Sequence, residues 1–484
     1  MSSEWLTTLL VVVPVGGGLA VWFFPWTRYQ AGSLAVLVAL VEVALWVEAA
    51  LAFDFSDPDL QLEQRYEWFS DLGVSYHVGL YAWSLWLAGA TAVVLAAAIA
   101  YAFWAGRERP RAYFGLMLLL TGAIAGVFVA QDLLVFYAFF EAMLIPLYVL
   151  VGVWGGAGRV TATLKFVIYT MAGSLLMLAA IVAFGLQQGT FDLVDSGTSG
   201  SVWLFLGFLA AFAVKAPLFP LHGWLPDAYR EASPEVAAVL SGIVSKAAVF
   251  GLLRIVLVKF PEPVSDLRVL VLSLAAAGLV YGSLVAFRAP DVRGVVAYSS
   301  LSQMGLITLG LFSGTTLGLD GAILHSVSHA LVSTSLFLLA GGIERRTATG
   351  ELALLGGMAR GRPALATVLM TSGIIALAVP GSSAFAGEFL ILAGVFDAGW
   401  WWSVIGAGAI VLAAMYMLRL ISAVLHVSPG PRVTEAALDL RPAELGILVP
   451  LLGVLLALSA WPNGITGHSF AGDFAQATRV EAGG

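Results

Sequence analysis

Six residues that can bind or release a proton stand in or beside apolar stretches of the chain. They are Glu141, Lys215, Lys246, His325, His329 and Glu388. A charged side chain at the centre of a bilayer costs roughly 2.5–3.5 kcal/mol on insertion scales, so such residues usually face protein or a water-filled cavity. Lysine can lose its proton when it is desolvated, whereas arginine effectively cannot. These residue types therefore indicate a proton relay.

Lys215 stands where an apolar run meets two prolines. It lies two residues before Pro217, and Pro220 follows. Prolines remove backbone donors and break helices, and broken backbone at membrane depth is tolerated only inside protein or beside water. The segment predicts an ion or proton site at Lys215. The alternative is that Lys215 reaches to the membrane interface and the prolines merely end a helix.

Two carboxylates have apolar neighbours. Glu141 lies mid-span, where an isolated carboxylate would be neutralised, and Lys215 is the obvious partner to keep it charged. The alternative is a protonated glutamate bonded to a carbonyl. Glu388 follows Pro380-Gly-Ser-Ser383, a second predicted helix break, and has no local partner. Its alternative is a helix N-terminal carboxylate favoured by the dipole.

A lysine and two histidines complete the set. Lys246 follows Ser241 and Ser245, small residues that leave room for water or close helix contact. His325 and His329 are one helical turn apart and share a face. Histidine can pass a proton between its two ring nitrogens, although either histidine could be structural. A metal site is disfavoured, because no carboxylate lies at matching spacing.

The composition is that of a polytopic membrane protein. Hydrophobic residues make up 60% of the chain and charged residues 11%, too apolar a balance for a water-soluble domain. Spans of roughly 20 residues divide it into about fourteen helices, and 363–396 is long enough to contain the second break. The absence of cysteine excludes cysteine-ligated iron–sulfur clusters, disulfides and thiol catalysis.

The connections between the spans predict the orientation of the chain in the membrane and indicate which chemistry must occur on other chains. Arginines gather in alternate connections, including 343–362, which the positive-inside rule places inward with both termini outward. The acidic loop 53–77 then lies outside. No P-loop, dinucleotide fingerprint or metal-spaced His/Cys cluster occurs. Any redox chemistry or ATP hydrolysis that is coupled to this chain must therefore occur on another one.

The two predicted breaks fall five spans apart, in corresponding positions, which points to inverted repeats. We therefore predict an all-α polytopic membrane protein with two inverted five-helix repeats and two broken helices. The predicted regions are 1–112 for helices 1–3, 113–256 for the first repeat, 266–424 for the second, and 425–484 for the last helix and a short tail.

Five motifs of the chain resemble those of a known family. They are Phe139-Phe-Glu-Ala-Met-Leu-Ile-Pro146, Ala213-Val-Lys-Ala-Pro217, Trp224-Leu-Pro-Asp227, Ala297-Tyr-Ser-Ser300 and Gly387-Glu-Phe-Leu-Ile391. Together they resemble the antiporter-like, proton-translocating subunits of NADH–quinone oxidoreductase, the respiratory complex I family. The resemblance runs from the third span to the thirteenth. A glutamate at the position of Glu388 is typical of one branch, whereas sister chains and cation/proton antiporter subunits typically have lysine.

The resemblance implies a role for each matching residue. Glu141 and Lys215 would form a coupling ion pair, Lys246 the central relay, and His329 and Glu388 the continuation toward the next subunit. It implies no cofactor on this chain, with NADH, FMN, iron–sulfur clusters and quinone on partner subunits. The partners would be other membrane subunits, including antiporter-like sister chains, in the bacterial plasma membrane, with no nucleic acid.

The chain departs from the family pattern at two places. Gln303 replaces a frequent histidine and cannot carry a charge, so the relay there would need water. Tyr81-Ala82 replaces Asp-Gly, which we interpret as a peripheral change. Two alternatives stay open: a cation/proton antiporter or membrane-hydrogenase subunit of the same fold, and a structural membrane subunit whose buried charges only specify helix packing.

Overall fold

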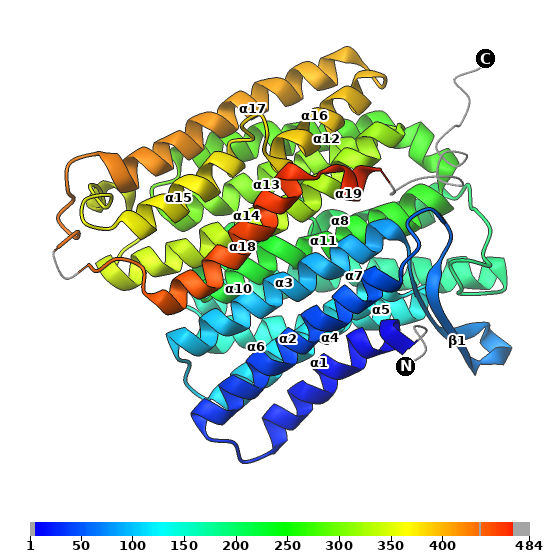
Figure 1. Ribbon diagram of the computed structural model, residues 1–484. Helices are drawn as coiled ribbons and strands as arrows, with labels where there is room; N and C mark the ends of the chain where they lie inside the picture. The colour runs from blue at the N-terminus through cyan, green and yellow to red at the C-terminus, as the bar shows by residue number, and fades with distance from the viewer. Residues whose placement is uncertain (1–4, 435–436, 468–484) are drawn as a thin grey trace.

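The computed structural model describes residues 5–434 and 437–467, and its long helices run side by side in one bundle (Figure 1). The helices are α1 (Leu6–Phe23), α2 (Arg28–Ala52), α3 (Ala82–Ala105), α4 (Pro110–Val129), α5 (Leu133–Ala142), α6 (Leu144–Trp154), α7 (Arg159–Gln188), α8 (Val202–Lys215), α9 (Leu225–Glu231), α10 (Pro234–Val239), α11 (Ser245–Gly251), α12 (Pro261–Arg288), α13 (Val292–Leu311), α14 (Thr316–Thr347), α15 (Pro363–Ala376), α16 (Ser383–Phe396), α17 (Trp400–Ile421), α18 (Pro442–Ala460) and α19 (Asn463–Thr466). The predicted tail beyond Gly467 lies outside the described residues.

The helices are those of a membrane protein. Within the described ranges, twelve helical stretches are long and apolar enough to cross a membrane, and α8, α15 and α16 are shorter apolar helices. The predicted helical membrane fold is confirmed. The count of about fourteen stays a prediction, because it depends on whether α8 and the α15–α16 pair each make a crossing.

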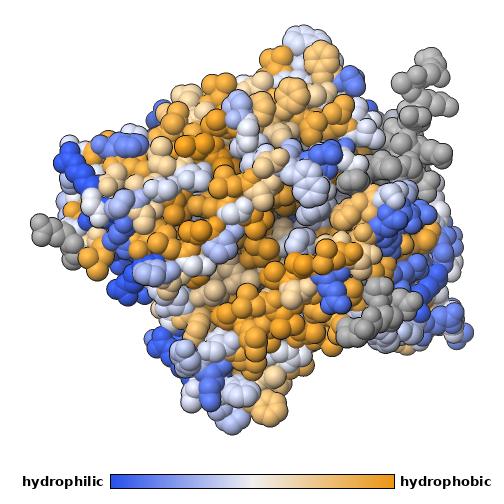
Figure 2. All heavy atoms as spheres, viewed as in Figure 1, coloured by the Kyte–Doolittle hydropathy of each residue, from blue (hydrophilic) through white to orange (hydrophobic). Residues whose placement is uncertain are grey.

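Burial separates a central group of helices from a lipid-facing group. The apolar windows of α14 and of the stretch Pro234–Leu257 are 100% buried inside the protein, whereas that of α2 is 22% buried. An apolar helix face that is not covered by protein needs lipid or a partner. Figure 2 shows an apolar band between two more hydrophilic ends, the surface expected of a chain embedded in a bilayer.

Both predicted helix breaks are present. α8 ends at Lys215, and helix resumes only at Leu225 in α9. The Trp224 indole N–H donates to the Val214 carbonyl oxygen at 2.9 Å, satisfying one carbonyl that the break would otherwise leave unpaired. In the second half, α15 ends at Ala376 and α16 begins at Ser383, with the Ser382 hydroxyl accepting from the Phe385 N–H.

Each interrupted helix is followed by a helix with π-helical turns. These turns are Leu240–Val244 and Leu252–Leu257 on either side of α11, and Ser422–His426 at the end of α17. π-Helical turns are rare and occur frequently at functional sites. Their recurrence after both breaks favours two related halves. The boundaries 113–256 and 266–424 of the repeats stay a prediction.

One element was not predicted from the sequence, a β-hairpin in the acidic loop before α3. β1 (Gln61–Phe69) pairs antiparallel with β2 (Val74–Leu80), and Tyr66 lies opposite Tyr76. The fold is therefore all-α apart from this hairpin. β1 is mostly exposed, so alternating burial is weak in its sequence. The hairpin is held by its contacts with helices instead, for example with α1.

A buried histidine fastens this hairpin to the loop after α7. The His77 side chain is inaccessible to solvent, its Nδ1 lies 2.5 Å from Asp192 Oδ2, and its Nε2 lies 2.8 Å from Glu63 Oε1. Burial would raise the pKa of Asp192. The hydrogen bond and charge of His77 outweigh that effect and hold the pKa below its usual value. β2 and the α7–α8 connection are therefore joined by a buried charged contact.

Lys259, just beyond the end of the span Pro234–Leu257, gives a prediction for pH-dependent stability. Its Nζ donates to the Ser196 carbonyl oxygen at 2.6 Å, and burial together with the nearby charge of Arg254 lowers its pKa to about 8. The unfolded lysine titrates near pH 10.4. Between these values only the unfolded state keeps the proton, so stability should rise with pH. We expect the thermal inactivation temperature of the wild type, measured relative to that of Lys259→Met, to increase as the pH is raised from 8 to 9.5.

The exposed Lys165 provides the control for this measurement. It pairs with Asp227 at 2.5 Å on the protein surface. The Lys165→Met variant should therefore still show the increase in thermal stability above pH 8. Parallel pH curves for the wild type and Lys259→Met would contradict the assignment.

Candidate functional site

The centre of the molecule holds a direct contact between a lysine and a histidine. Lys246 on α11 places its Nζ 2.6 Å from His329 Nδ1 on α14, and both residues are buried. The same Nζ donates to the Ser241 carbonyl oxygen at 3.0 Å and to the Ser245 hydroxyl at 3.2 Å. An ammonium has three donors, and these three acceptors offset part of its cost of burial. The Lys246–His329 contact can therefore hold one proton on either nitrogen.

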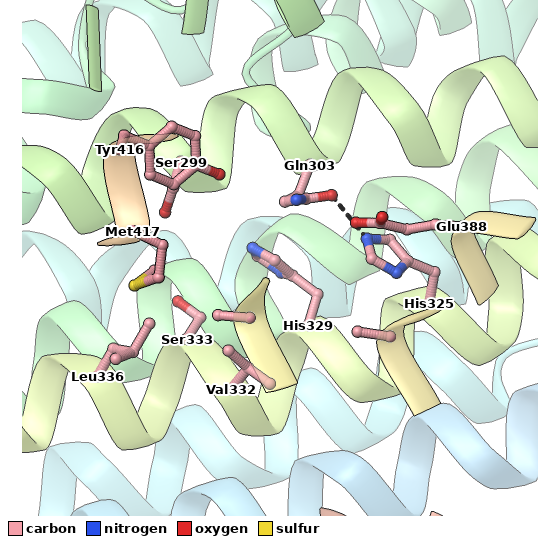
Figure 3. Close-up of a pocket in the computed structure, with 12 residues that line it drawn as sticks. Ser299, Gln303, His325, His329, Val332, Ser333, Leu336, Glu388, Tyr416 and Met417 are labelled. Atoms are coloured by element: carbon pink, nitrogen blue, oxygen red, sulfur yellow. Dashed lines mark hydrogen bonds between the residues drawn. The ribbon is translucent and has the colours of Figure 1, made fainter. Parts of the chain in front are cut away.

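Gln303 binds the second buried histidine and so links α13 to α14. Gln303 Oε1 on α13 lies 2.8 Å from His325 Nε2 on α14. Figure 3 shows Glu388, which comes from α16, beside both of these side chains. Glu388 is 2% exposed, and its Oε2 has no hydrogen-bond partner among the described residues. A carboxyl group with a free oxygen in this position can receive a proton.

A polar cavity connects the histidines with Glu388. Its polar lining residues are Ser299, Gln303, His325, His329, Ser333, Glu388 and Tyr416 (Figure 3). The cavity volume is about 30 Å³. A water needs roughly 10–15 Å³ on this measure, so the cavity has room for about two waters with polar partners on several sides. Water there would bridge the step at which Gln303 cannot carry a charge.

Ser241 lies between Lys246 and the same cavity, because Lys246 Nζ binds its backbone carbonyl oxygen while its hydroxyl belongs to a separate group of buried serine hydroxyls. The Ser241 hydroxyl donates to Ser300 Oγ at 2.8 Å, and its oxygen lies 2.5 Å from Ser333 Oγ, which lines the cavity. Each hydroxyl can donate and accept at once. From the sequence, Ser241 is predicted only as a small residue, because its partners lie far away in the chain and only helix packing brings them together.

Lys215 is buried at the end of α8, where it faces an aromatic ring rather than a carboxylate. Its Nζ lies 4.5 Å from the ring centroid of Phe140, within the range of a cation–π interaction. Among the described residues, no ion pair of 4.0 Å or less joins Lys215 to Glu141. The charge of Glu141 still acts on Lys215 over a longer distance. The two side chains are not in direct contact in this structure, and the predicted pairing of Glu141 with Lys215 stays a prediction.

The position of Glu141 explains this difference. Glu141 is half-buried, and Ile145 and Tyr148 on the following turns are exposed. Adjacent helical residues point about 100° apart, so Phe140 faces inward toward Lys215 while Glu141 faces the edge of the bundle. The structure thus joins Lys246 to His329, gathers His325, His329 and Glu388 round one cavity, and leaves Glu141 at the periphery.

Arg254 and Glu42 are among the buried ionisable residues that were missed from the sequence. Arg254 lies in the span that contains Lys246, donates to Gln131 Oε1 at 3.0 Å and stacks over the Tyr81 ring at 5.0 Å. Glu42 is 3% exposed on α2. Both residues interrupt apolar runs, and this pattern in the sequence could have identified them. The contact with Arg254 also shows that the change at Tyr81 affects a buried charge and is not merely peripheral.

The fold and the buried row of lysine, histidine and glutamate define an antiporter-like membrane subunit. The family described as "NADH:quinone oxidoreductase/Mrp antiporter, TM" matches residues 130–413, more than half of the chain. The chain therefore belongs to this family, and the resemblance seen in its motifs is confirmed.

Relatives and solved structures agree with this assignment. "NADH-quinone oxidoreductase subunit M" of Rhodobacter capsulatus is 35% identical over 459 residues, covering 91% of this chain and 88% of the relative. A chain of the respiratory complex I from Thermus thermophilus with bound NADH is 33% identical, with a TM-score of 0.88 over 98% of this chain and 99% of that one. A chain of the Mrp complex from Dietzia sp. DQ12-45-1b has the same TM-score at 22% identity, covers 99% of both chains, and shares the fold.

Proposed function

We propose that this chain is a proton-translocating membrane-arm subunit of an NADH–quinone oxidoreductase, working in the bacterial plasma membrane. The observation that carries the proposal is the buried Lys246–His329 contact, which opens onto a polar cavity shared with Glu388. Membership of the family supports it, as do the relatives named subunit M. Quinone reduction takes place on other subunits and drives this relay.

The residues divide the transfer into short steps. A proton on Lys246 passes to His329 Nδ1 across 2.6 Å, and His329 releases one from its other ring nitrogen toward the cavity. Water in the cavity carries it past Gln303 to Glu388. A positive charge on Lys215 disfavours a second one on Lys246 by like-charge repulsion. A change of charge near Lys215 therefore changes the proton affinity of Lys246 and favours proton transfer from Lys246 through His329 to Glu388.

The geometry favours a proton over a metal cation. The central contact joins two nitrogens, which bind a proton and, once protonated, repel a cation. The cation/proton antiporter alternative, whose fold this chain shares, would move sodium. The structural alternative, in which buried charges only specify packing, leaves the cavity and the free oxygen of Glu388 without a role.

Other subunits would supply the redox cofactors and cover the half-buried Glu141. A carboxylate exposed to lipid at membrane depth is costly, so we expect a neighbouring membrane subunit to face it. In this proposal NADH, FMN, iron–sulfur clusters and quinone bind to partner chains. The proposal includes no cofactor on this chain.

A purification and a transport assay test this function together. We would purify the tagged chain with its partners in mild detergent, reconstitute the assembly into vesicles and add NADH and a quinone. Co-purified flavin and iron–sulfur proteins, with acidification that a protonophore abolishes, would support the proposal. If the tagged chain were recovered with small membrane subunits alone and the vesicles took up sodium, the chain would instead be a cation/proton antiporter subunit.

A further inference from the structure

A groove of about 730 Å³ lies away from the relay, between α2, α3 and α18. Figure 1 shows α3 between the other two helices. Its lining includes Arg28, Tyr29, Val36, Phe103, Trp104 and Ile447. One end is therefore cationic and aromatic, and the other residues are apolar. The groove lies at the end of the bundle that the arginine distribution places inward.

The cationic end carries positive charge without a balancing carboxylate. Arg28 is exposed, and among the described residues no ion pair or hydrogen bond of its side chain occurs. Arg345 reaches the same end of α3, where its Nη1 donates to the Ala105 carbonyl oxygen at 3.2 Å and its guanidinium lies 4.5 Å from the Trp104 ring. The nearby carboxylate of α18, Glu444, is already bound by Arg346 at 2.6 Å and 2.9 Å.

The Arg28 side chain lies against the C-terminal cap of α3. A Cβ on Gly106, which caps the C-terminus of α3 with φ +73°, would come within 1.8 Å of Arg28 Nη2. The guanidinium therefore rests against the glycine cap, at the negative end of the α3 dipole. Because Arg28 is exposed and lines the groove, its guanidinium can bind a phosphate oxygen pair there in the bidentate way that guanidinium favours.

The other walls suit an acyl chain. Val36, Ala100 and Ile447 give an apolar surface along the helices, and the Tyr29 and Phe103 rings lie 5.4 Å apart at the charged end. Aromatic residues at this level are typical of the membrane interface. The cytoplasmic leaflet supplies anionic headgroups that basic residues attract. We propose that this groove binds one anionic phospholipid, its phosphate on Arg28 and an acyl chain between α2 and α18.

Native mass spectrometry of the full-length chain in detergent tests this site. Dioleoylphosphatidylglycerol and the zwitterionic dioleoylphosphatidylcholine would be titrated against the wild type, Arg28→Gln and Arg28→Lys. We expect Arg28→Gln to weaken phosphatidylglycerol binding about fivefold, the effect of one basic residue near a membrane surface. Arg28→Lys should retain most of it. Arg111→Gln, another exposed arginine outside the groove, is the charge-matched control.

A second pair of variants tests the apolar part. Gly446 lines the groove and Gly453 lies two turns further along α18, and a Cβ on either meets nothing within 4 Å. Gly446→Phe should fill the groove and weaken lipid binding, whereas Gly453→Phe should not. Equal binding of the two lipids, or unchanged phosphatidylglycerol binding by both Arg28→Gln and Gly446→Phe, would overturn the proposal. The site does not depend on the proton relay.

Discussion

Replacing Lys246 with methionine is expected to abolish proton pumping, reducing vesicle acidification per NADH oxidised at least tenfold (an estimate on the scale of removing a proton-transfer group). Methionine keeps an unbranched apolar chain in the site but removes the group that exchanges a proton with His329 at 2.6 Å. Electron transfer from NADH to a soluble acceptor should continue, because the proposed function places it on partner subunits. The two activities would be measured in the same reconstituted complex.

Two further variants separate chemistry from structure. Lys246→Arg keeps a positive charge but holds its proton at any accessible pH, so pumping should stay low in a complex that is assembled normally. Lys165→Met removes an exposed lysine that pairs only with Asp227 and should leave pumping near the wild-type level. Normal pumping by Lys246→Met would mean that the proton takes another route.

The sequence pointed to the candidate relay residues because charge is rare in apolar runs. It could not identify the contacts, because these depend on side chains 83 residues apart for Lys246 and His329. At Glu141 it suggested a direct contact with Lys215 that this structure does not contain. A one-residue step along a helix turns the side chain by about 100°, so a linear motif cannot show that Phe140, and not Glu141, meets Lys215.

One miss and one incomplete prediction have other physical causes. The β-hairpin has little apolar alternation of its own, and buried His77 joins it to Asp192. Local patterning therefore could not reveal it. Gln303 was recognised as a neutral replacement, and the structure adds what the sequence could not show: it binds His325 and lines a cavity that has room for water.

The second large effect is expected at Lys215. Lys215→Ala should abolish pumping, because it removes the only buried lysine at the first break, while Lys215→Arg should keep the cation beside Phe140 but block proton release. Lys215→Arg should thus assemble normally and pump poorly. The measurement is again acidification per NADH oxidised, with electron transfer to a soluble acceptor as the assembly control.

Variants of Glu141 give a further test of Lys215, because the charge of Glu141 acts on Lys215 from a distance. Glu141→Gln should reduce pumping less than Lys215→Ala does, since the charge is lost without breaking a direct contact. If the double variant Glu141→Leu/Lys215→Met pumped normally, these two charges would serve only helix packing. If Glu141→Gln were as severe as Lys215→Ala, the carboxylate would have to meet Lys215 directly at some stage of the cycle, and a hinge at the α8 break would have to bring them together.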